Sequence, residues 1–451
     1  MENINFVPCV CFVKRGVAKT NPDKVQLTKE ELAEIINKAK EEIDDKSENE
    51  NSDAEMATDE NKENGTTTME DEFKLEDYDK NKELPSSVLG IGSIALIGDA
   101  ETESYFNKRD RDDDVDDSDS EAEDDIIKSD DNLILVGHVE GDSSILEVYI
   151  YNENEGSLYV HHDLLLPTFP LCIEWLDYDP SNPKPGNLCA IGTMDTEIEI
   201  WDLDIIDCLE PAFKLGSKKK KYGHKDAVLD LAWNKNYHHI MASGSADKTV
   251  KLWDIDTCKV HTTFSHATDK IQTLCWHLLE HQTLLVGSCD GYARIYDCTQ
   301  ANGTHKSWKV SGEIEKTEWD AQNPFCFGAS TNEGEVYYID CRVENPIWQI
   351  KAHNKEVTGL SISQVCPGLL ITASSDNIVK TWDTKNGTPQ LISEKDMKIG
   401  DIQGMTVCPE NTFVIACGGD NKSNNFGVWD LRNEERVQNV FGSRNLVVIS
   451  G

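Results

Sequence analysis

The sequence lacks the features that mark several large functional classes. No stretch reaches the roughly 18 consecutive apolar residues that a membrane-spanning helix needs. The short apolar run at residues 6–13 has no small-residue cleavage site after it, so we expect neither a membrane span nor a signal peptide. The 14 cysteines are scattered singly, with Cys9 and Cys11 the closest approach, and zinc-ligand spacing is absent. A reducing compartment, the cytosol or the nucleus, is the simplest interpretation.

Basic residues are also scarce. The 451 residues include 43 Lys and Arg against 83 Asp and Glu, a formal net charge of −40. A field of that sign repels phosphates, so direct nucleic-acid binding is not expected. Gly90, Gly92 and Gly98 lack the spacing of a dinucleotide fingerprint. No nucleophile, base and orienting group are evident together, and we therefore expect no enzymatic activity, no cofactor and no metal.

What the sequence does contain is a repeat. Residues 223–254 begin with Gly-His, end with Trp-Asp and hold three short β-like runs between turn residues. Units of this kind, about 40–45 residues long, are typical of propeller blades of the WD40 type. Trp233, Trp276 and Trp319 recur in the first strand of successive units. The ends of the units are Trp201-Asp202, Trp253-Asp254, Tyr296-Asp297, Ile339-Asp340, Trp382-Asp383 and Trp429-Asp430.

These residue types predict a buried polar chain inside each blade. An indole N–H in a sheet core needs an acceptor, which a Ser or Thr on the neighbouring strand can supply. A histidine then links that hydroxyl to the Asp of the tight turn. We interpret the histidines as structural, neither catalytic nor metal-binding. The predicted network residues are His224, Asp247, Trp253, His266, Asp290, His353, Asp376 and Trp382.

The fold class predicted is all-β, a seven-bladed WD40 β-propeller with a long disordered acidic insertion and one N-terminal helix. Residues 1–14 supply the first strand of blade 1, although they could also be a short apolar terminus packed outside the ring. Residues 15–131 hold a helix at 28–43 and the insertion, and residues 132–442 hold the blades. Residues 443–451 are a tail or a closing strand that would compete with the N-terminal strand.

Residues 41–131 differ in composition from the rest. They hold 34 Asp and Glu against 9 Lys and Arg, too much charge and too few apolar residues to fold alone. We expect residues 45–83 and 108–125 to be disordered. The apolar island at 84–97, like the helix at 28–43, either docks on the propeller or binds a partner. Ser118 and Ser120 each have an acid three residues on, which suits acid-directed kinases but also fits a solvated charge run.

Three further patterns have a functional and a structural interpretation. Lys218, Lys219, Lys220 and Lys221 form either a nuclear-import signal or a solvated loop. Trp429, Asp430 and Arg432 match the W-D-x-R pattern of propeller adaptors of ubiquitin ligases; no arginine follows Asp202, Asp254, Asp297 or Asp383 at that spacing. His161 and His162 invite a metal hypothesis, but neighbours in a strand point to opposite faces, which argues against a shared ion.

Several segments along essentially the whole chain, not only in the repeats, resemble one family. They are FVKRGVAKTNPDKVQLTKEEL at 12–32, DDNLILVGHVE at 130–140, YVHHDLLL at 159–166, EWLDYDPS at 174–181 and HKDAVLDLAWN at 224–234. Together they are similar to the periodic tryptophan protein 1 family. That resemblance implies a nuclear and nucleolar propeller protein associated with chromatin, ribosomal RNA transcription and ribosome biogenesis. The lysine tract is shorter than the family's basic loop, and the acidic insertion has its own composition.

Two functional hypotheses remain. The first is a monomeric, non-enzymatic scaffold within larger assemblies in ribosome biogenesis. It would act in rRNA transcription or processing and chromatin association, with the acidic arm holding basic proteins such as histones or ribosomal proteins. The second is a substrate adaptor of a cullin-type ubiquitin ligase. Co-purification with pre-ribosomal particles or with cullin components would separate them.

Overall fold

The computed structural model describes residues 4–25, 126–220, 222–300, 303 and 305–447. The chain divides into two compact units, one formed by residues 1–25 with 118–451 and the other by residues 26–117. The second unit lies outside the described residues. So do the predicted helix at 28–43, the acidic spans 45–83 and 108–125, the apolar island at 84–97, and Ser118, Ser120 and Lys221.

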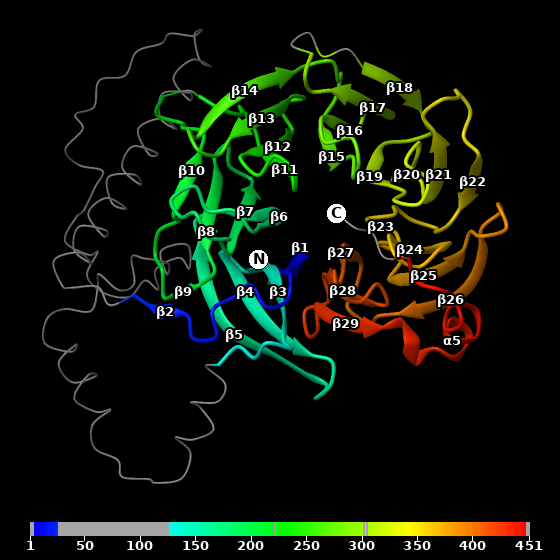
Figure 1. Cartoon of the computed structure of the whole chain (residues 1–451), viewed down its shortest axis with the longest axis horizontal. Helices are drawn as coiled ribbons and strands as arrows, with labels where there is room; N and C mark the ends of the chain where they lie inside the picture. The colour runs from blue at the N-terminus through cyan, green and yellow to red at the C-terminus, as the bar shows by residue number, and fades with distance from the viewer. Residues whose placement is uncertain (1–3, 26–125, 221, 301–302, 304, 448–451) are drawn as a thin grey trace, which may run out of the picture. The chain divides into compact units, whose positions relative to one another are not determined.

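Seven antiparallel sheets are arranged around a central axis, and the innermost strand of each faces the channel (Figure 1). Blade 1 is β1 (Asn5–Phe12), β3 (Asn132–Glu140), β4 (Ser143–Asn152) and β5 (Ser157–Leu166). Blade 2 is β6 (Pro170–Leu176), β7 (Leu188–Thr193), β8 (Ile198–Asp202) and β10 (Phe213–Leu215). Blade 3 is β11 (Val228–Trp233), β12 (Ile240–Ser245), β13 (Val250–Asp254) and β14 (Lys259–Phe264).

The next three blades repeat this pattern of four strands. Blade 4 is β15 (Ile271–Trp276), β16 (Thr283–Ser288), β17 (Tyr292–Asp297) and β18 (His305–Lys309). Blade 5 is β19 (Ile314–Trp319), β20 (Cys326–Thr331), β21 (Glu335–Asp340) and β22 (Trp348–Lys351). Blade 6 is β23 (Gly359–Ile362), β24 (Leu369–Ala373), β25 (Ile378–Asp383) and β26 (Gln390–Asp396).

Blade 7 differs, because its sheet has three strands in the described part of the chain. They are β27 (Ile402–Val407), β28 (Val414–Gly419) and β29 (Phe426–Asp430). A 3-10 turn, η3 (Leu431–Asn433), and a short helix, α5 (Glu435–Phe441), follow β29. Val437 and Phe441 of α5 are buried in the core between blades 6 and 7. Residues 443–447 are not in a strand, and residues 448–451 of the predicted tail or closing strand lie outside the described residues.

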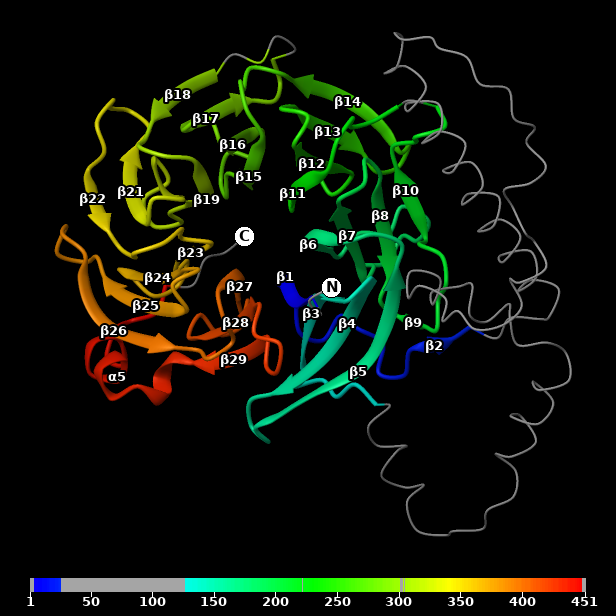
Figure 2. The same ribbon diagram turned by 180° about the vertical axis from the view of Figure 1, so that it is seen from behind.

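The N-terminal strand β1 is the innermost strand of blade 1, paired antiparallel with β3. It also contacts β27 and β28, and Figures 1 and 2 both place it beside blade 7. Among the described residues, no strand of blade 1 is hydrogen-bonded to a strand of blade 7. Val7 and Phe12 pack against Val414 and Ala416 there. A Cβ on Gly418 would lie 2.6 Å from the carbonyl oxygen of Val7, so this close approach needs glycine.

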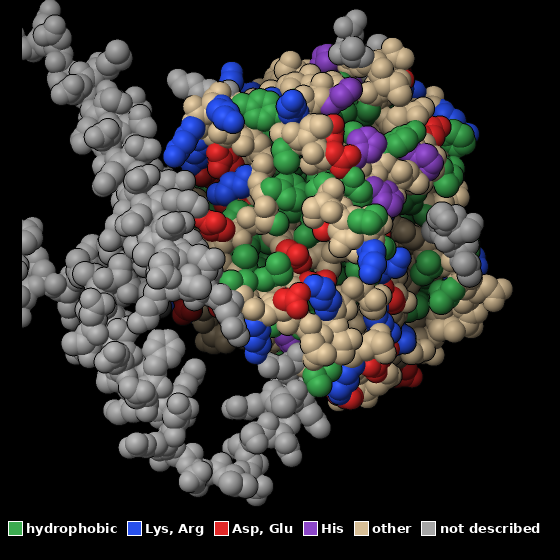
Figure 3. Space-filling model, turned by 60° about the vertical axis from the view of Figure 1, so that its left-hand side comes forward, with side chains coloured by type: hydrophobic (Ala, Val, Ile, Leu, Met, Phe, Trp, Pro, Cys, Tyr) green, Lys and Arg blue, Asp and Glu red, His purple; other side chains and the backbone are tan. Residues whose placement is uncertain are grey.

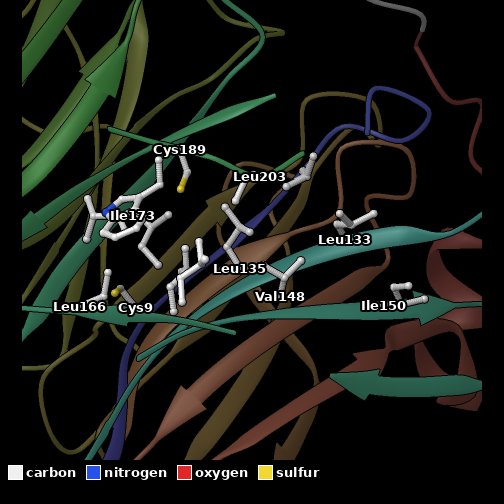
Figure 4. Packing of buried hydrophobic residues seen from close by; sticks show 14 of the residues in the cluster. Cys9, Leu133, Leu135, Val148, Ile150, Leu166, Ile173, Cys189 and Leu203 are labelled. Atoms are coloured by element: carbon white, nitrogen blue, oxygen red, sulfur yellow. The ribbon is translucent and has the colours of Figure 1, made fainter. Parts of the chain in front are cut away.

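The core is divided among the interfaces between neighbouring blades. Figure 4 shows the cluster between blades 1 and 2, where Leu135 and Val148 point toward Ile173 and Cys189. A two-residue parallel pairing of β2 (Asp23–Lys24) with β9 (Ile205–Ile206) adds a contact at blade 2. None of the described helices is long and apolar enough to cross a membrane.

Candidate functional site: blade networks, paired arginines and the channel

Blade 3 contains a complete hydrogen-bonded chain from its tryptophan to its turn. Trp253 Nε1 donates to Ser243 Oγ at 2.7 Å, and His224 Nε2 lies 2.7 Å from the same oxygen. His224 Nδ1 is 3.0 Å from Asp247 Oδ2. The Asp247 carboxylate also accepts the backbone N–H of Thr249, which ties the β12–β13 turn to the sheet. Lys248 in this turn has φ 68°, a left-handed conformation that the turn imposes on a non-glycine residue.

Blade 6 repeats the chain with Thr in place of Ser. Trp382 Nε1 donates to Thr372 Oγ1 at 3.0 Å, and His353 Nε2 lies 2.8 Å from that oxygen. His353 Nδ1 is 3.0 Å from Asp376 Oδ1. Both histidines are buried, so their rings have the structural role of joining hydroxyl to carboxylate.

The charges of these pairs follow from burial and hydrogen bonding. Burial raises the pKa of Asp247, but hydrogen bonds from His224 and Thr249 outweigh it and hold that pKa well below its ordinary range. Burial lowers the pKa of His224, and Asp247 opposes that shift only in part. The blade therefore favours a carboxylate beside a neutral imidazole.

The prediction for blade 4 is wrong at His266. Its exposed ring packs against Tyr296 and His305 at centroid distances of 5.7 and 4.6 Å. Asp290 instead pairs with Arg294 through contacts of 3.0 and 2.7 Å. Register explains the difference: Val286 of β16 stands where Ser243 stands in blade 3, each paired with the residue two before the third-strand aromatic, so β16 supplies no hydroxyl at that position. A histidine there would have nothing to join to the turn.

Two of the three recurring first-strand tryptophans, Trp276 and Trp319, act between blades, whereas Trp233 Nε1 donates to the carbonyl of His238 within blade 3. Trp276 Nε1 donates to the carbonyl of Ala232 at 2.9 Å, and Trp319 Nε1 donates to that of Cys275 at 3.2 Å. Each indole thus fastens one innermost strand to the preceding one. Glu318 acts in the other direction, because its carboxylate accepts the backbone N–H of Ile362 at 2.6 Å. Burial raises the pKa of Glu318 to about 8.

The central channel contains a cavity of about 310 Å³ lined by the innermost strands. Its charged lining consists of Asp230, Glu315, Glu356 and Lys316. Lys316 Nζ is 3.7 Å from Asp230 Oδ1. Burial, followed by the charges of Glu356 and Glu313, raises the pKa of Glu315 to about 7. With three carboxyl groups and one ammonium, the channel favours cationic over anionic side chains.

The W-D-x-R arginine is already engaged within the ring. Arg432 Nε and Nη2 lie 3.0 and 2.7 Å from the two carboxylate oxygens of Asp430, and Nη2 also contacts Glu153 of blade 1. The expectation that no other unit has an arginine at this spacing is wrong, because the unit that ends at Asp340 has Arg342. There Arg342 Nε and Nη2 lie 2.9 and 2.6 Å from the Asp340 carboxylate. Two Asp-x-Arg pairs therefore occur, and the one in blade 7 also bridges the seam.

The lysine loop is a surface turn closed by the bridge between Ser217 and Tyr222. Lys218, Lys219 and Lys220 are exposed. The backbone N–H of Lys218 donates to Glu197 at 2.8 Å, and its ammonium contacts Asp195. The positive charge of Lys218 is thus partly neutralised by these neighbouring acidic side chains.

The two adjacent histidines of β5 do not point to opposite faces. The register shift between Val148 and Tyr149 makes His161 the extra residue of a β-bulge in β5, because Val148 pairs with His162 and Tyr149 with Val160. As a result His161 Nδ1 and His162 Nδ1 are 2.8 Å apart. Strand alternation, which predicted opposite faces for the two rings, does not hold at this bulge. Among the described residues, no group of three or more His, Cys, Asp and Glu side chains is arranged to hold a metal ion.

The repeats, the seven sheets and the blade networks define a WD-repeat β-propeller. The WD domain, G-beta repeat family model matches residues 216–254 and 344–383, the two blades whose Trp–Ser/Thr–His–Asp chains are complete. A chain of the mitotic checkpoint complex crystal structure shares this fold, with a TM-score of 0.53 and 14% sequence identity over 66% of this chain and 84% of that one.

Full-length similarity then places the chain in a family. It is 42% identical to the periodic tryptophan protein 1 homolog of Drosophila melanogaster, over 98% of this chain and 97% of that protein. It is 30% identical to periodic tryptophan protein 1 of Saccharomyces cerevisiae, over 96% and 89% of the two chains. A ribosome biogenesis protein WDR12 homolog of Drosophila mojavensis is 23% identical over 46% of this chain and 50% of its own. The chain belongs to the periodic tryptophan protein 1 family.

Proposed function

We propose that this protein is a non-enzymatic scaffold in ribosome biogenesis that acts in the nucleus and nucleolus by binding basic proteins. The observation that carries the proposal is the similarity along 98% of the chain to a periodic tryptophan protein 1 homolog, since it includes the segments outside the repeats. A relative over part of the ring is itself named a ribosome biogenesis protein. Roles in rRNA transcription or processing and in chromatin association are the finer parts of the proposal.

Charge supports basic partners such as histones or ribosomal proteins. Without residues 41–131 the chain still has 49 acidic against 34 basic residues, and the channel carries a surplus of carboxyl groups. On the face in Figure 3, Lys and Arg side chains are interspersed with Asp and Glu and form no broad basic area. Such a surface favours cationic protein segments over a phosphate backbone.

The remaining predicted residues have accessory roles in this proposal. Lys218–Lys221 act as the import loop, and phosphorylation at Ser118 and Ser120 adds charge to the acidic arm. The cullin-adaptor alternative has less support, because the Arg432 guanidinium is already paired with Asp430 and Glu153.

The acidic arm can be tested by its effect on association rate. Deleting residues 108–125 should lower the on-rate for purified core histones by roughly tenfold at low salt and much less at high salt, because screening shortens the reach of the arm. Stopped-flow fluorescence measures this rate. A matched control replaces the Asp and Glu of 108–125 by Asn and Gln; it keeps the length and should behave like the deletion.

Equal rates for both variants and the unaltered protein would show that the arm is a passive spacer. The process itself is tested in cells by depletion, followed by pulse labelling of ribosomal RNA. Normal synthesis and processing after depletion would contradict the nucleolar role, and co-purification with cullin components instead of pre-ribosomal particles would favour the adaptor.

A further inference from the structure

Blade 7 ends in an open sheet edge. Six blades have an outer strand, namely β5, β10, β14, β18, β22 and β26, whereas β29 has none in the described part of the chain. Figures 1 and 2 show the chain leaving β29 directly into the segment that bears α5. That helix packs against β26 of blade 6 and does not lie along β29.

The alternation of backbone hydrogen bonds along β29 shows which of its N–H and C=O groups have no partner among the described residues. Leu431 N donates to Phe413 O at 2.8 Å, and Gly419 N donates to Asn425 O at 2.7 Å. Because hydrogen-bonded residues alternate along an antiparallel pair, the backbone N–H and C=O groups of Trp429 and Gly427, which lie between these two points, face β28. Phe426, Val428 and Asp430 therefore point their N–H and C=O groups outward. This is the row of groups that a further strand would pair with.

Blade 1 leaves a matching apolar surface beside this edge. Val160 is opposite Tyr149 and Leu158 is opposite Tyr151 in the β4–β5 pairing. Directly opposed residues share a face of the sheet, and both tyrosines pack against blade 7. Tyr149 lies 4.8 Å from Phe426 between ring centroids. Yet Leu158 and Val160, one strand further out, are 40% and 44% exposed.

The exposed pair lies where blade 7 has no outer strand among the described residues. In blade 7 the position across from β5 would be filled by side chains of an outer strand. Outer strands elsewhere in the ring bury some of their apolar side chains, since Phe264 of β14 is 2% exposed and Trp308 of β18 is 5% exposed, although Leu391 of β26 is 46% exposed. The open edge and the exposed Leu158 and Val160 thus form two sides of one slot.

The described C-terminal chain cannot fill this slot. After α5, Arg444 pairs with Asp383 at 2.6 Å, and Val447 N donates to Val365 O at 2.8 Å, both in blade 6. Two outer strands of the ring show what the position accepts: β10, with Phe213 and Leu215, and β22, with Trp348 and Ile350, are extended segments with apolar side chains at alternate residues. β29 has five residues, so about five paired residues, roughly 17 Å of strand, would complete the blade.

We propose that the outer edge of β29 in blade 7 binds an extended segment of a partner protein as an added β-strand, with alternate apolar side chains covering Leu158 and Val160. The backbone hydrogen bonds supply affinity, and the slot beside blade 1 supplies selection for apolar residues. The proposal rests on the geometry of blade 7 and not on the role in ribosome biogenesis, so either can fail alone.

Synthetic peptides provide the probe. Six peptides with the sequences of the six outer strands, each extended by two residues at both ends, are titrated into the full-length protein by fluorescence anisotropy. At least one should bind in the micromolar range. N-methylation of one set of alternate residues should abolish its binding, because those N–H groups face the edge. Methylation of the other set should leave binding intact, because those groups face solvent.

Two substitutions locate the binding site. Val160→Asp should weaken binding at least tenfold, whereas Leu279→Asp, at a leucine 58% exposed in a loop of blade 4, should not change it. Hydrogen exchange reports the edge directly. The amides of Phe426 and Val428 should exchange rapidly in the free protein and slowly with the peptide, while that of Trp429 is protected in both.

Three results would overturn the proposal. One is the failure of all six peptides to bind at about 1 mM. Another is binding that both N-methylated sets retain or lose alike. The third is slow exchange of Phe426 and Val428 without peptide, since another segment of this chain would then hold the edge in the monomer, or a second copy if the protection grows with protein concentration.

Discussion

Blades 3 and 7 carry the same Trp-Asp ending, yet they are held in different ways. In blade 3 the Trp253 indole ends in a closed chain of hydrogen bonds through Ser243 and His224. In blade 7 the Trp429 indole N–H is buried and has no partner among the described residues. By register, Cys417 stands where Ser243 stands in blade 3, and a thiol is a weak acceptor.

Blades 3 and 7 are therefore stabilised by different kinds of contact. Blade 3 is fixed by bonds within its own sheet, so its turn and its tryptophan are held together whatever its neighbours do. Blade 7 depends on packing against blades 6 and 1, through α5 on one side and β1 on the other. A Trp-Asp ending therefore identifies a blade without showing how the blade is held.

The largest effect should come from removing the aromatic side chain that anchors α5 in the core between blades 6 and 7. Phe441→Ala in α5 should lower the free energy of unfolding by about 3–5 kcal/mol, because a side chain 1% exposed leaves a cavity. Phe264→Ala, in the outer strand of blade 3, is the matched substitution and should cost a similar amount. Urea unfolding measures both, and a loss below about 1 kcal/mol for Phe441 alone would show that α5 is not needed by blade 7.

A smaller loss is expected from breaking the polar chain of blade 3. Asp247→Ala should destabilise the protein by about 1–3 kcal/mol, because His224 and the turn amides lose a buried acceptor. Asp420→Ala is the control in blade 7, where an exposed carboxylate accepts the backbone N–H of Asp401 at 2.8 Å. Thermal unfolding of both should show a shift for Asp247 several times that for Asp420; equal shifts would remove the distinction between the blades.

The smallest effect should be a gain. Cys417→Ser supplies a hydroxyl near the unpaired Trp429 N–H and should stabilise the protein by about 1 kcal/mol, the net worth of one buried hydrogen bond. The reverse change in blade 3, Ser243→Cys, should destabilise it. Urea midpoints measure the pair, and a loss of stability from both changes would mean that the acceptor position differs between the two blades.

Much of this architecture can be predicted from the sequence, because the first-strand tryptophans recur every 43 residues from Trp233 to Trp319. The networks of blades 3 and 6 follow the same logic, since each has its His, its hydroxyl and its turn Asp. The prediction for His266 failed because blade 4 has the histidine but lacks the hydroxyl that the histidine would bond to. That signal was present in the sequence, at Val286 and Tyr296.

Other features could not be found this way. The helix α5 has seven residues and buries only Val437 and Phe441, too short a pattern to distinguish from the end of a blade. The open edge of β29 arises because the chain after it forms α5 and packs on blade 6, and this tertiary arrangement has no local sequence signal. The β-bulge at His161 and His162 depends on the register with β4, which strand alternation alone does not determine.

The position of β1 also constrains how the ring can be made. Residues 5–12 are the first part of the ring to leave the ribosome, but their pairing partner β3 begins at Asn132, and the seam contacts on β27 and β28 come after residue 401. Contacts of such sequence separation form slowly. The apolar strand with Val7 and Phe12 thus waits unpaired until β3 is made, and its face toward the seam stays uncovered until blade 7 is complete, so the nascent chain is exposed to aggregation over that time.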